Sequence, residues 1–342
     1  MHHKIVALDA WNVPIPQSLL QLPEPHTFEL ANHTTQLASA EAVQDAVRDA
    51  TVIATTVTPV KGAVLDASNT PNLQLIVAIA AGTDCIDTER ATARGIKVVN
   101  CPGANTETVA NHVLAMYFAG RRHLVHLHNT VLRTDEWTRK YSLSSALNDP
   151  KGRPPMTCKD ETVGIVGYGA IGRRIAELCR SLDMKVLIAG RKGAPASPGR
   201  TPLTQVLAES SVVVLCVPRG PDTLGLISAQ ELQQMTEHAL LINVSRGGIV
   251  DEDALLDALR AGSIGGAATD VFLKEPSNAG TLWAEGDSPL LKVDADEAGR
   301  LNLVVTPHVA WCSTTTFHNY LQAFKRHVED WCLQASDGNS RR

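Results

Sequence analysis

Short apolar runs alternate along the chain with segments whose apolar residues recur at helical spacing. In the first hundred residues the apolar runs lie at 4–9, 51–55, 75–79 and 94–100. Helical spacing occurs between them at 40–50 and 88–93. Strands that alternate with helices predict an α/β domain built on a parallel sheet.

The same alternation resumes after residue 161. Strand-like runs lie at 163–166, 185–189, 211–217, 239–243 and 265–270, and helical patterns at 202–208, 228–235 and 252–261. The pattern predicts a second doubly wound parallel sheet, of the Rossmann type.

The segments between the sheets indicate how the two domains are connected. Residues 106–126 show the spacing of one long helix that leads into the second domain. A chain that crosses out at 101–106 should cross back near 307–313, so the helical stretch at 314–333 should belong to the first, flavodoxin-like domain. We expect chemistry in the cleft between the domains. The expected domains are 1–105 with 307–342, and 106–306.

A glycine-rich turn begins the second alternation. The apolar run at 163–166 is followed by Gly167-Tyr-Gly169-Ala170-Ile171-Gly172 and then by a helical pattern. In this context the first glycine permits a tight turn, the second lets the backbone approach a pyrophosphate, and the third lets the helix pack on the strand. The helix N-terminus offers N–H groups to the phosphates. The sequence therefore predicts a dinucleotide-binding site.

Composition excludes several other classes of function. A chain of 342 residues, 44% hydrophobic and 20% charged, is ordinary for a soluble globular protein. Its net charge of −5 gives no reason to expect nucleic acid or an anionic membrane as partner. The first residues read as a strand without the hydrophobic region of a signal peptide, and no apolar run approaches the roughly 18 residues that span a bilayer, so we expect neither a signal peptide nor a membrane span. The seven cysteines are scattered without a CxxC pair, so we expect reduced thiols, a cytoplasmic location and no metal.

The end of the second strand of this domain bears on which dinucleotide is bound. An NAD site usually carries an acidic residue about 20 positions after the glycines, where it bonds the ribose hydroxyls. Here Gly190 stands at that position, and Arg191 and Lys192 follow. An arginine there can bind a 2′-phosphate through charge-assisted hydrogen bonds, so the sequence favours NADP over NAD.

Three later segments each begin at the carboxyl end of a predicted strand. They carry Arg246, Glu275 and His308. Ligands of doubly wound sheets bind outside this end of the strands, so we expect the three side chains beside the nicotinamide. An arginine, a carboxylate and a histidine at that place predict an active site.

With these motifs the chain resembles the D-isomer-specific 2-hydroxyacid dehydrogenases over nearly its whole length. The motifs lie at 167–172, 243–255, 270–276 and 306–308. Within the family, Trp311 and the Gly190-Arg191 strand end are most similar to glycerate dehydrogenases and glyoxylate/hydroxypyruvate reductases. The resemblance implies reduction of a small 2-keto acid, such as glyoxylate or hydroxypyruvate, to the D-2-hydroxy acid. It also implies a homodimer formed through the 106–128 helix and the loop after it.

The family also implies a role for each of the three residues. His308 would give a proton to the carbonyl oxygen, a task suited to an imidazole. Glu275 would bond the other ring nitrogen and favour the protonated ring. Arg246 would bind the substrate carboxylate and carbonyl. Further implied contacts are Thr106, Val217, Pro218, Thr223, Val244, Ser245, Asp270 and His308 for the cofactor, and Ala81, Gly82 and Trp311 for the substrate.

Departures from the family pattern leave alternatives open. Gly220 replaces a common hydroxyl residue, 138–141 lacks a tryptophan of some glyoxylate reductases, and 278–300 is long and reads as a surface insertion. The alternatives are formate, phosphite or phosphoglycerate dehydrogenase, and a nucleotide-sensing scaffold similar to corepressors. Glu275 in place of glutamine argues against the formate type. The lack of a regulatory domain after residue 333 argues against the phosphoglycerate type, and the lack of a long tail argues against the scaffold.

Overall fold

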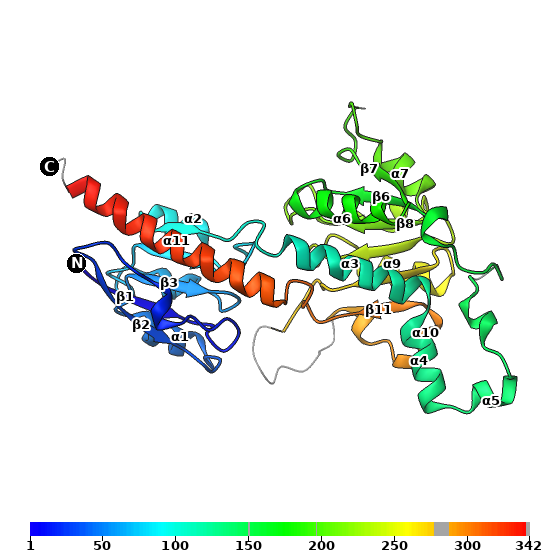
Figure 1. The fold of residues 1–342 in the computed structure, drawn as a ribbon, viewed down its shortest axis with the longest axis horizontal. Coiled ribbons are helices and arrows are strands. Elements are labelled where there is room, and N and C mark those ends of the chain that lie inside the picture. The colour runs from blue at the N-terminus through cyan, green and yellow to red at the C-terminus, as the bar shows by residue number, and fades with distance from the viewer. Residues whose placement is uncertain (150, 196, 277–286, 340–342) are drawn as a thin grey trace. The chain divides into compact units, whose positions relative to one another are not determined.

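The computed structural model describes residues 1–149, 151–195, 197–276 and 287–339, with side chains described as far as residue 334. The chain divides into two compact units (Figure 1). Unit 1 contains Met1–Asn105 and Cys312–Arg342, and unit 2 contains Thr106–Glu275 and the described residues 287–311. Short 3-10 turns occur at Gln17–Leu19, Gly62–Leu65, Ser144–Leu147, Cys158–Asp160 and Pro289–Leu291.

Unit 1 is built on a five-stranded parallel sheet with the order β2-β1-β3-β4-β5. This is the order of flavodoxin-like doubly wound sheets, and it confirms the predicted fold class. Its strands are β1 (His2–Ala7), β2 (Thr27–Asn32), β3 (Val52–Thr55), β4 (Leu75–Ala78) and β5 (Lys97–Val99). Its helices are α1 (Ala40–Val47), α2 (Thr88–Ala93) and α11 (Thr314–Asn339).

The first edge strand of this sheet, β2, is missing from the sequence prediction. Every residue of β3 and β4 is buried, so these strands produce continuous apolar runs. In β2 only Leu30 is buried, because a strand at the edge of the sheet is covered less completely. Such a strand leaves little hydrophobic pattern in the sequence.

The long C-terminal helix α11 belongs to unit 1 and runs along its sheet (Figure 1). Phe324, Val328 and Cys332 are fully buried along it. Asn319 donates a hydrogen bond to the carbonyl of Ala104 at 2.9 Å. The helix therefore completes the core of a unit whose strands all precede residue 100.

Unit 2 is built on a six-stranded parallel sheet with the order β11-β10-β9-β8-β6-β7. The chain runs from β6 to β7 on one side and then continues with β8 on the other, so the strand order reverses beside β6. In doubly wound sheets ligands bind at such a switch point. The strands are β6 (Thr162–Val166), β7 (Lys185–Ile188), β8 (Val212–Leu215), β9 (Leu240–Asn243), β10 (Gly266–Thr269) and β11 (Leu303–Val305). The helices are α3 (Thr106–Arg121), α4 (Leu124–Arg133), α5 (Glu136–Lys140), α6 (Ala170–Ser181), α7 (Leu203–Glu209), α8 (Ala229–Leu232), α9 (Glu252–Arg260) and α10 (Ala295–Arg300).

Helices cover both faces of this second sheet (Figure 1). Val163 and Ile165 of β6 belong to a core cluster formed with α3 and α6. Val213 and Leu215 of β8 belong to a cluster formed with α7, α8 and α9 on the opposite face. Alternate residues of a strand point to opposite faces, so a strand covered on both sides reads as a continuous apolar run.

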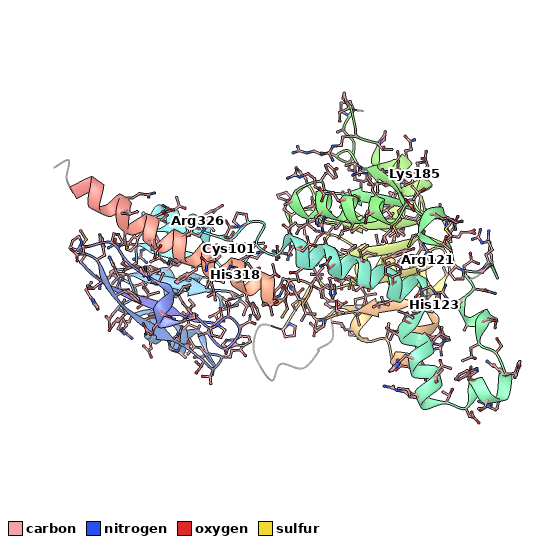
Figure 2. All side chains as sticks on the ribbon, viewed as in Figure 1. Cys101, Arg121, His123, Lys185, His318 and Arg326 are labelled. Atoms are coloured by element: carbon pink, nitrogen blue, oxygen red, sulfur yellow. The ribbon has the colours of Figure 1, made fainter. Side chains whose placement is uncertain are left out.

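The single long helix predicted at 106–126 is wrong. The structure has two helices, α3 and α4, separated by a turn at His123, whose φ of 47° is left-handed (Figure 2). At the end of α3, the Arg121 guanidinium binds the buried Glu161 carboxylate through Nε at 2.6 Å and Nη2 at 3.1 Å. This pair fixes the end of α3 to the start of β6, and the chain then turns away into α4, which packs on α10.

The surface insertion predicted at 278–300 lies partly outside the described residues. From residue 287 onward the segment is part of unit 2: Leu290 is 3% exposed within the core, and α10 packs against α4 and β11. All seven cysteines are free thiols, although Cys312 is exposed. Within the described residues, no helix combines the length and apolar character needed to cross a membrane.

Candidate functional site

The glycine turn between β6 and α6 has the geometry that the sequence predicts. Gly167 has a φ of 100°, and a Cβ there would lie 2.5 Å from the carbonyl oxygen of Cys216. A Cβ on Gly172 would lie 2.1 Å from the carbonyl oxygen of Gly167, so only glycine lets the helix approach the turn. A Cβ on Gly169 would meet nothing within 4 Å. The N-terminus of α6, beginning at Ala170 and Ile171, therefore faces open space suited to a pyrophosphate.

A basic pocket of about 930 Å³ adjoins this turn. A Cβ on Gly190 would come no closer than 3.6 Å to a neighbouring atom, so the place of the usual NAD-binding carboxylate is open. The predicted Val217 and Pro218 lie in the pocket wall. The charged lining residues are Arg191, Lys192, Arg200, Arg219 and Asp222.

The cations of this pocket differ in their partners. Lys192 pairs with the buried Glu231 at 2.9 Å. Burial raises the pKa of Glu231, but hydrogen bonds from Ser228 and Lys192 bring it below its ordinary value. Arg191 is exposed, and its side chain has neither a hydrogen bond nor an ion pair with any described residue, although its carbonyl accepts from Ala194 N–H at 3.1 Å. Lys192 was predicted as a cofactor contact, but its charge is already compensated within the protein.

Arg200 is a pocket residue that the sequence prediction missed. Its guanidinium lies over the ring of Tyr168, 5.0 Å from the centroid. The loop from 190 to 200 returns to the sheet because Thr201 N–H bonds the Ile188 carbonyl and Gly190 N–H bonds the Thr201 carbonyl, both at 2.8 Å. This folding back, which no local spacing signals, places Arg200 in the same pocket as Arg191.

The loops after β9, β10 and β11 carry Arg246, Glu275 and His308. Asn243 holds the first loop: its side chain accepts from Ser245 N–H at 3.1 Å and donates to the Arg246 carbonyl at 3.3 Å. A Cβ on Gly247 would lie 1.7 Å from the carbonyl oxygen of Phe272, so glycine lets the first two loops touch.

Glu275 and His308 form a hydrogen-bonded pair. Their Oε2 and Nδ1 atoms are 2.7 Å apart, and the other carboxylate oxygen accepts from Phe272 N–H at 3.0 Å. Burial raises the pKa of Glu275, but the hydrogen bond and charge of His308, with Phe272 N–H and the Arg246 charge, bring it below its ordinary value. The carboxylate is therefore ionised at neutral pH and accepts a hydrogen bond from Nδ1–H of His308. Glu275 and His308 are thus hydrogen-bonded to each other, and the Arg246 charge acts on the same carboxylate.

The backbone of His308 is held in a left-handed conformation, with a φ of 54°. Such a conformation is costly for a residue other than glycine and persists where its surroundings enforce it. Its N–H donates to the Asp270 carbonyl at 2.8 Å, and its carbonyl accepts from the Trp311 ring N–H at 2.9 Å. Trp311, a predicted substrate contact, thus fixes the loop that carries His308.

Asp270, which the family resemblance implies as a cofactor contact, holds the loop after β11. Its carboxylate, 1% exposed, accepts from Thr306 Oγ1 at 2.6 Å and from the N–H groups of Val309 and Ala310 at 2.9 Å. His112 of α3 lies 3.1 Å from Thr306 Oγ1 and extends this network. Sequence reasoning missed His112, because one polar residue on an amphipathic helix gives no local signal.

Other predicted cofactor contacts fall into two groups. The hydroxyls of Thr106 and Ser245 are buried without a hydrogen-bond partner among the described residues, and Val244, which directly precedes Ser245, is 9% exposed. Orphaned buried hydroxyls are suited to a ligand. The Thr223 hydroxyl instead closes its own turn, donating to the Pro218 carbonyl at 2.7 Å and accepting from Gly220 N–H at 2.8 Å.

The predicted substrate contacts Ala81 and Gly82 belong to unit 1 and follow β4 at its carboxyl end. The Ala81 carbonyl accepts from the Asn100 side chain at 2.7 Å, which holds the turn in place. Their part in binding a substrate stays a prediction.

Comparison with known proteins shows which chains this one resembles. The family model of the D-isomer specific 2-hydroxyacid dehydrogenase, NAD binding domain, matches residues 114–310. A glycerate dehydrogenase of Methylorubrum extorquens is 40% identical over 71% of both chains. A putative 2-hydroxyacid dehydrogenase of Haemophilus influenzae is 32% identical over 97% of this chain and 98% of its own. The structure of an NADPH-dependent glyoxylate/hydroxypyruvate reductase of Sinorhizobium meliloti, with NADP and malonate, is 28% identical with a TM-score of 0.71 over 96% of this chain and 93% of its own.

Proposed function

Because this chain belongs to the D-isomer-specific 2-hydroxyacid dehydrogenase family, and so is an NAD(P)-dependent oxidoreductase, we propose that it reduces glyoxylate or hydroxypyruvate with NADPH. Hydroxypyruvate would give the D-2-hydroxy acid, and glyoxylate would give glycolate, which is achiral. The observation that carries the proposal is the 2.7 Å pair of Glu275 and His308, within the unit that also holds the glycine turn and the basic pocket. The relatives named glycerate dehydrogenase and glyoxylate/hydroxypyruvate reductase support the substrate class.

In this reaction His308 supplies the proton. Glu275 accepts a hydrogen bond from Nδ1–H of the charged imidazole ring. The proton on Nε2 is therefore the one that passes to the carbonyl oxygen of the substrate. The bound reduced nicotinamide supplies the hydride. Arg246 binds the substrate carboxylate and stabilises the negative charge that develops on the oxygen.

The NADP preference rests on the basic pocket. Arg191 and Arg200 bind the 2′-phosphate, and Gly190 leaves room where a carboxylate would repel it. An acidic residue at position 190 would instead favour the ribose hydroxyls of NAD.

The homodimer expected from the family has support in the exposed apolar residues of α4 and α5. Leu124 is 52% exposed, Leu132 70% and Trp137 56%. A surface of this kind is typical of a protein interface. Light scattering after gel filtration tests it: Leu132→Glu should lower the mass toward one chain, and an unchanged dimer would place the interface elsewhere.

Steady-state kinetics test the proposed reaction directly. A panel of 2-keto acids, each with NADPH and NADH, should give the highest kcat/KM for glyoxylate or hydroxypyruvate with NADPH. His308→Ala should lower kcat by about 10²–10⁴-fold, the usual contribution of a general acid. Nucleotide binding without turnover of any 2-keto acid would favour the sensing scaffold. Wild-type turnover by His308→Ala would refute the assigned proton donor.

A further inference from the structure

Three residues far apart in sequence meet in the interior of unit 1. His3 lies in β1, His26 directly precedes β2, and Cys332 lies in α11. The two histidines are 5% exposed and the cysteine is fully buried. One donor atom from each, a ring nitrogen or the sulfur, lies within 4.8 Å of the other two.

The fold explains why these side chains converge. In the parallel register of β1 and β2, His3 lies opposite Phe28, so His26 and His3 are at the same end of the two strands. The helix α11 places Cys332 there, and the neighbouring Trp331 packs edge-on against the His3 ring with centroids 4.9 Å apart. The sequence predicts no metal site because it contains no ligand motif of short spacing, whereas these three positions are brought together only by the sheet and the last helix.

The hydrogen bonding of His3 is incomplete. Its Nε2 atom lies 2.7 Å from Nδ1 of His26, so one proton is shared there. Its Nδ1 atom is buried and has no hydrogen-bond partner among the described residues. An ion bound between the two facing nitrogens, Nε2 of His3 and Nδ1 of His26, would take the place of this shared proton, and Nδ1 of His3 would remain the nitrogen of that ring that is not a ligand.

We propose that His3, His26 and Cys332 form a binding site for one Zn²⁺ ion. Two imidazole nitrogens and a thiolate sulfur are the ligand types that zinc prefers. With Zn–N bonds of about 2.05 Å and tetrahedral angles, the two nitrogens would lie about 3.3 Å apart. The imidazoles therefore separate by roughly half an ångström on binding. The ion ties the first strands of unit 1 to the end of α11.

The protonation states in the cluster fix the proton balance of binding. Burial, with the neighbouring His26 and the N-terminal amine, lowers the pKa of His3 to about 4, and burial lowers the pKa of His26 as well. Both rings are therefore neutral at pH 7, as metal ligands must be. Burial, with the Glu329 charge, raises the pKa of Cys332 to about 11, while the N-terminal amine lowers it. Binding of zinc as a thiolate complex thus releases one proton per ion.

Cobalt titration of the intact protein tests the proposal, because a cobalt–thiolate bond gives an intense near-ultraviolet band. We expect one Co²⁺ per chain with this band, and its displacement by Zn²⁺. Calorimetry of zinc binding in two buffers should give about one proton released, and the affinity should rise about tenfold per pH unit near neutrality. The proposal is overturned if the wild-type protein binds no stoichiometric ion or develops no thiolate band.

Variants locate the site. Cys332→Ser and His26→Gln should lose the band, while kinetics with 2-keto acid and far-ultraviolet circular dichroism report whether each variant is folded. Two controls should bind as the wild type does: Cys312→Ser, which removes an exposed thiol, and His2→Gln, which removes an exposed imidazole beside the N-terminus. A band that survives in Cys332→Ser, or that disappears in Cys312→Ser, would overturn the assignment.

Discussion

The substitution Arg191→Ala tests which cations of the basic pocket bind the 2′-phosphate. Arg191 is exposed and unpaired among the described residues, so its removal should leave the fold intact. A hydrogen bond to a charged group contributes about 1.5–3 kcal/mol, and the lower end applies at an exposed site. Because about 1.4 kcal/mol is a factor of ten, kcat/KM with NADPH should fall about tenfold. With NADH it should not change.

Substitutions of two other cations of the pocket, Arg200 and Lys192, show whether the effect is specific to the arginines. Arg200→Ala should act in the same direction, since its guanidinium lies over Tyr168 in the same pocket. If the two arginines act independently, the double variant should lose about 100-fold with NADPH. Lys192→Ala is the matched control: its charge is paired with Glu231, so the NADPH to NADH ratio should change less than about threefold.

Initial rates at saturating 2-keto acid, measured over a range of each nucleotide, give the ratio directly. Thermal unfolding of each variant confirms that the fold is retained. An equal loss with both cofactors for Arg191→Ala would refute a contact with the 2′-phosphate. The NADPH to NADH ratio of kcat/KM should change more for Arg191→Ala than for Lys192→Ala. The opposite order would refute the inference that the ion pair with Glu231 keeps Lys192 from binding the 2′-phosphate.

Three further predictions concern the catalytic pair, its support and the buried histidines. Glu275→Gln should lower kcat about tenfold, since an amide does not stabilise the positive charge of a protonated imidazole; an unchanged kcat would contradict the pairing. His112→Phe should lower kcat about threefold to tenfold, and His112→Gln, whose amide still donates to Thr306, should restore most of it; equal loss in both would mean that packing alone matters. The pKa of His3 is lowered from 6.5 to about 4, so the unfolded chain takes up the proton first as the pH falls. With a chelator present, the free energy of unfolding should therefore decrease by up to about 3 kcal/mol between pH 6.5 and 4, and His3→Gln should flatten this dependence in urea titrations.

The sequence predicts the fold well where burial is complete. Strands such as β4 and β9, buried along their whole length, leave apolar runs that identify them. The edge strand β2 leaves no such run, because only Leu30 is buried. The break between α3 and α4 escapes hydrophobic periodicity for a different reason. It follows the pairing of Arg121 with Glu161, 40 positions away in the chain.

The residues of the candidate site likewise fall into those that the sequence predicts and those that it does not. The glycines of the turn and the residues Arg246, Glu275 and His308 are predictable because the motif that carries each one also fixes its place at a strand end. Arg200 and His112 are not, because each depends on a partner from another element. The same holds for Lys192, whose charge looks free in the sequence and is paired with Glu231 in the fold.

One segment, 270–275, holds both the backbone and the ring of His308. The Asp270 carboxylate accepts from the two N–H groups that follow His308, and its carbonyl accepts from His308 N–H itself. Five residues later Glu275 holds the imidazole Nδ1. A left-handed residue costs on the order of 1–3 kcal/mol, and each hydrogen bond to a carboxylate contributes about 1.5–3 kcal/mol, so the Asp270 network is sufficient to enforce it. The loop after β10 therefore fixes the direction in which His308 presents its second nitrogen, which is what the proposed proton transfer requires.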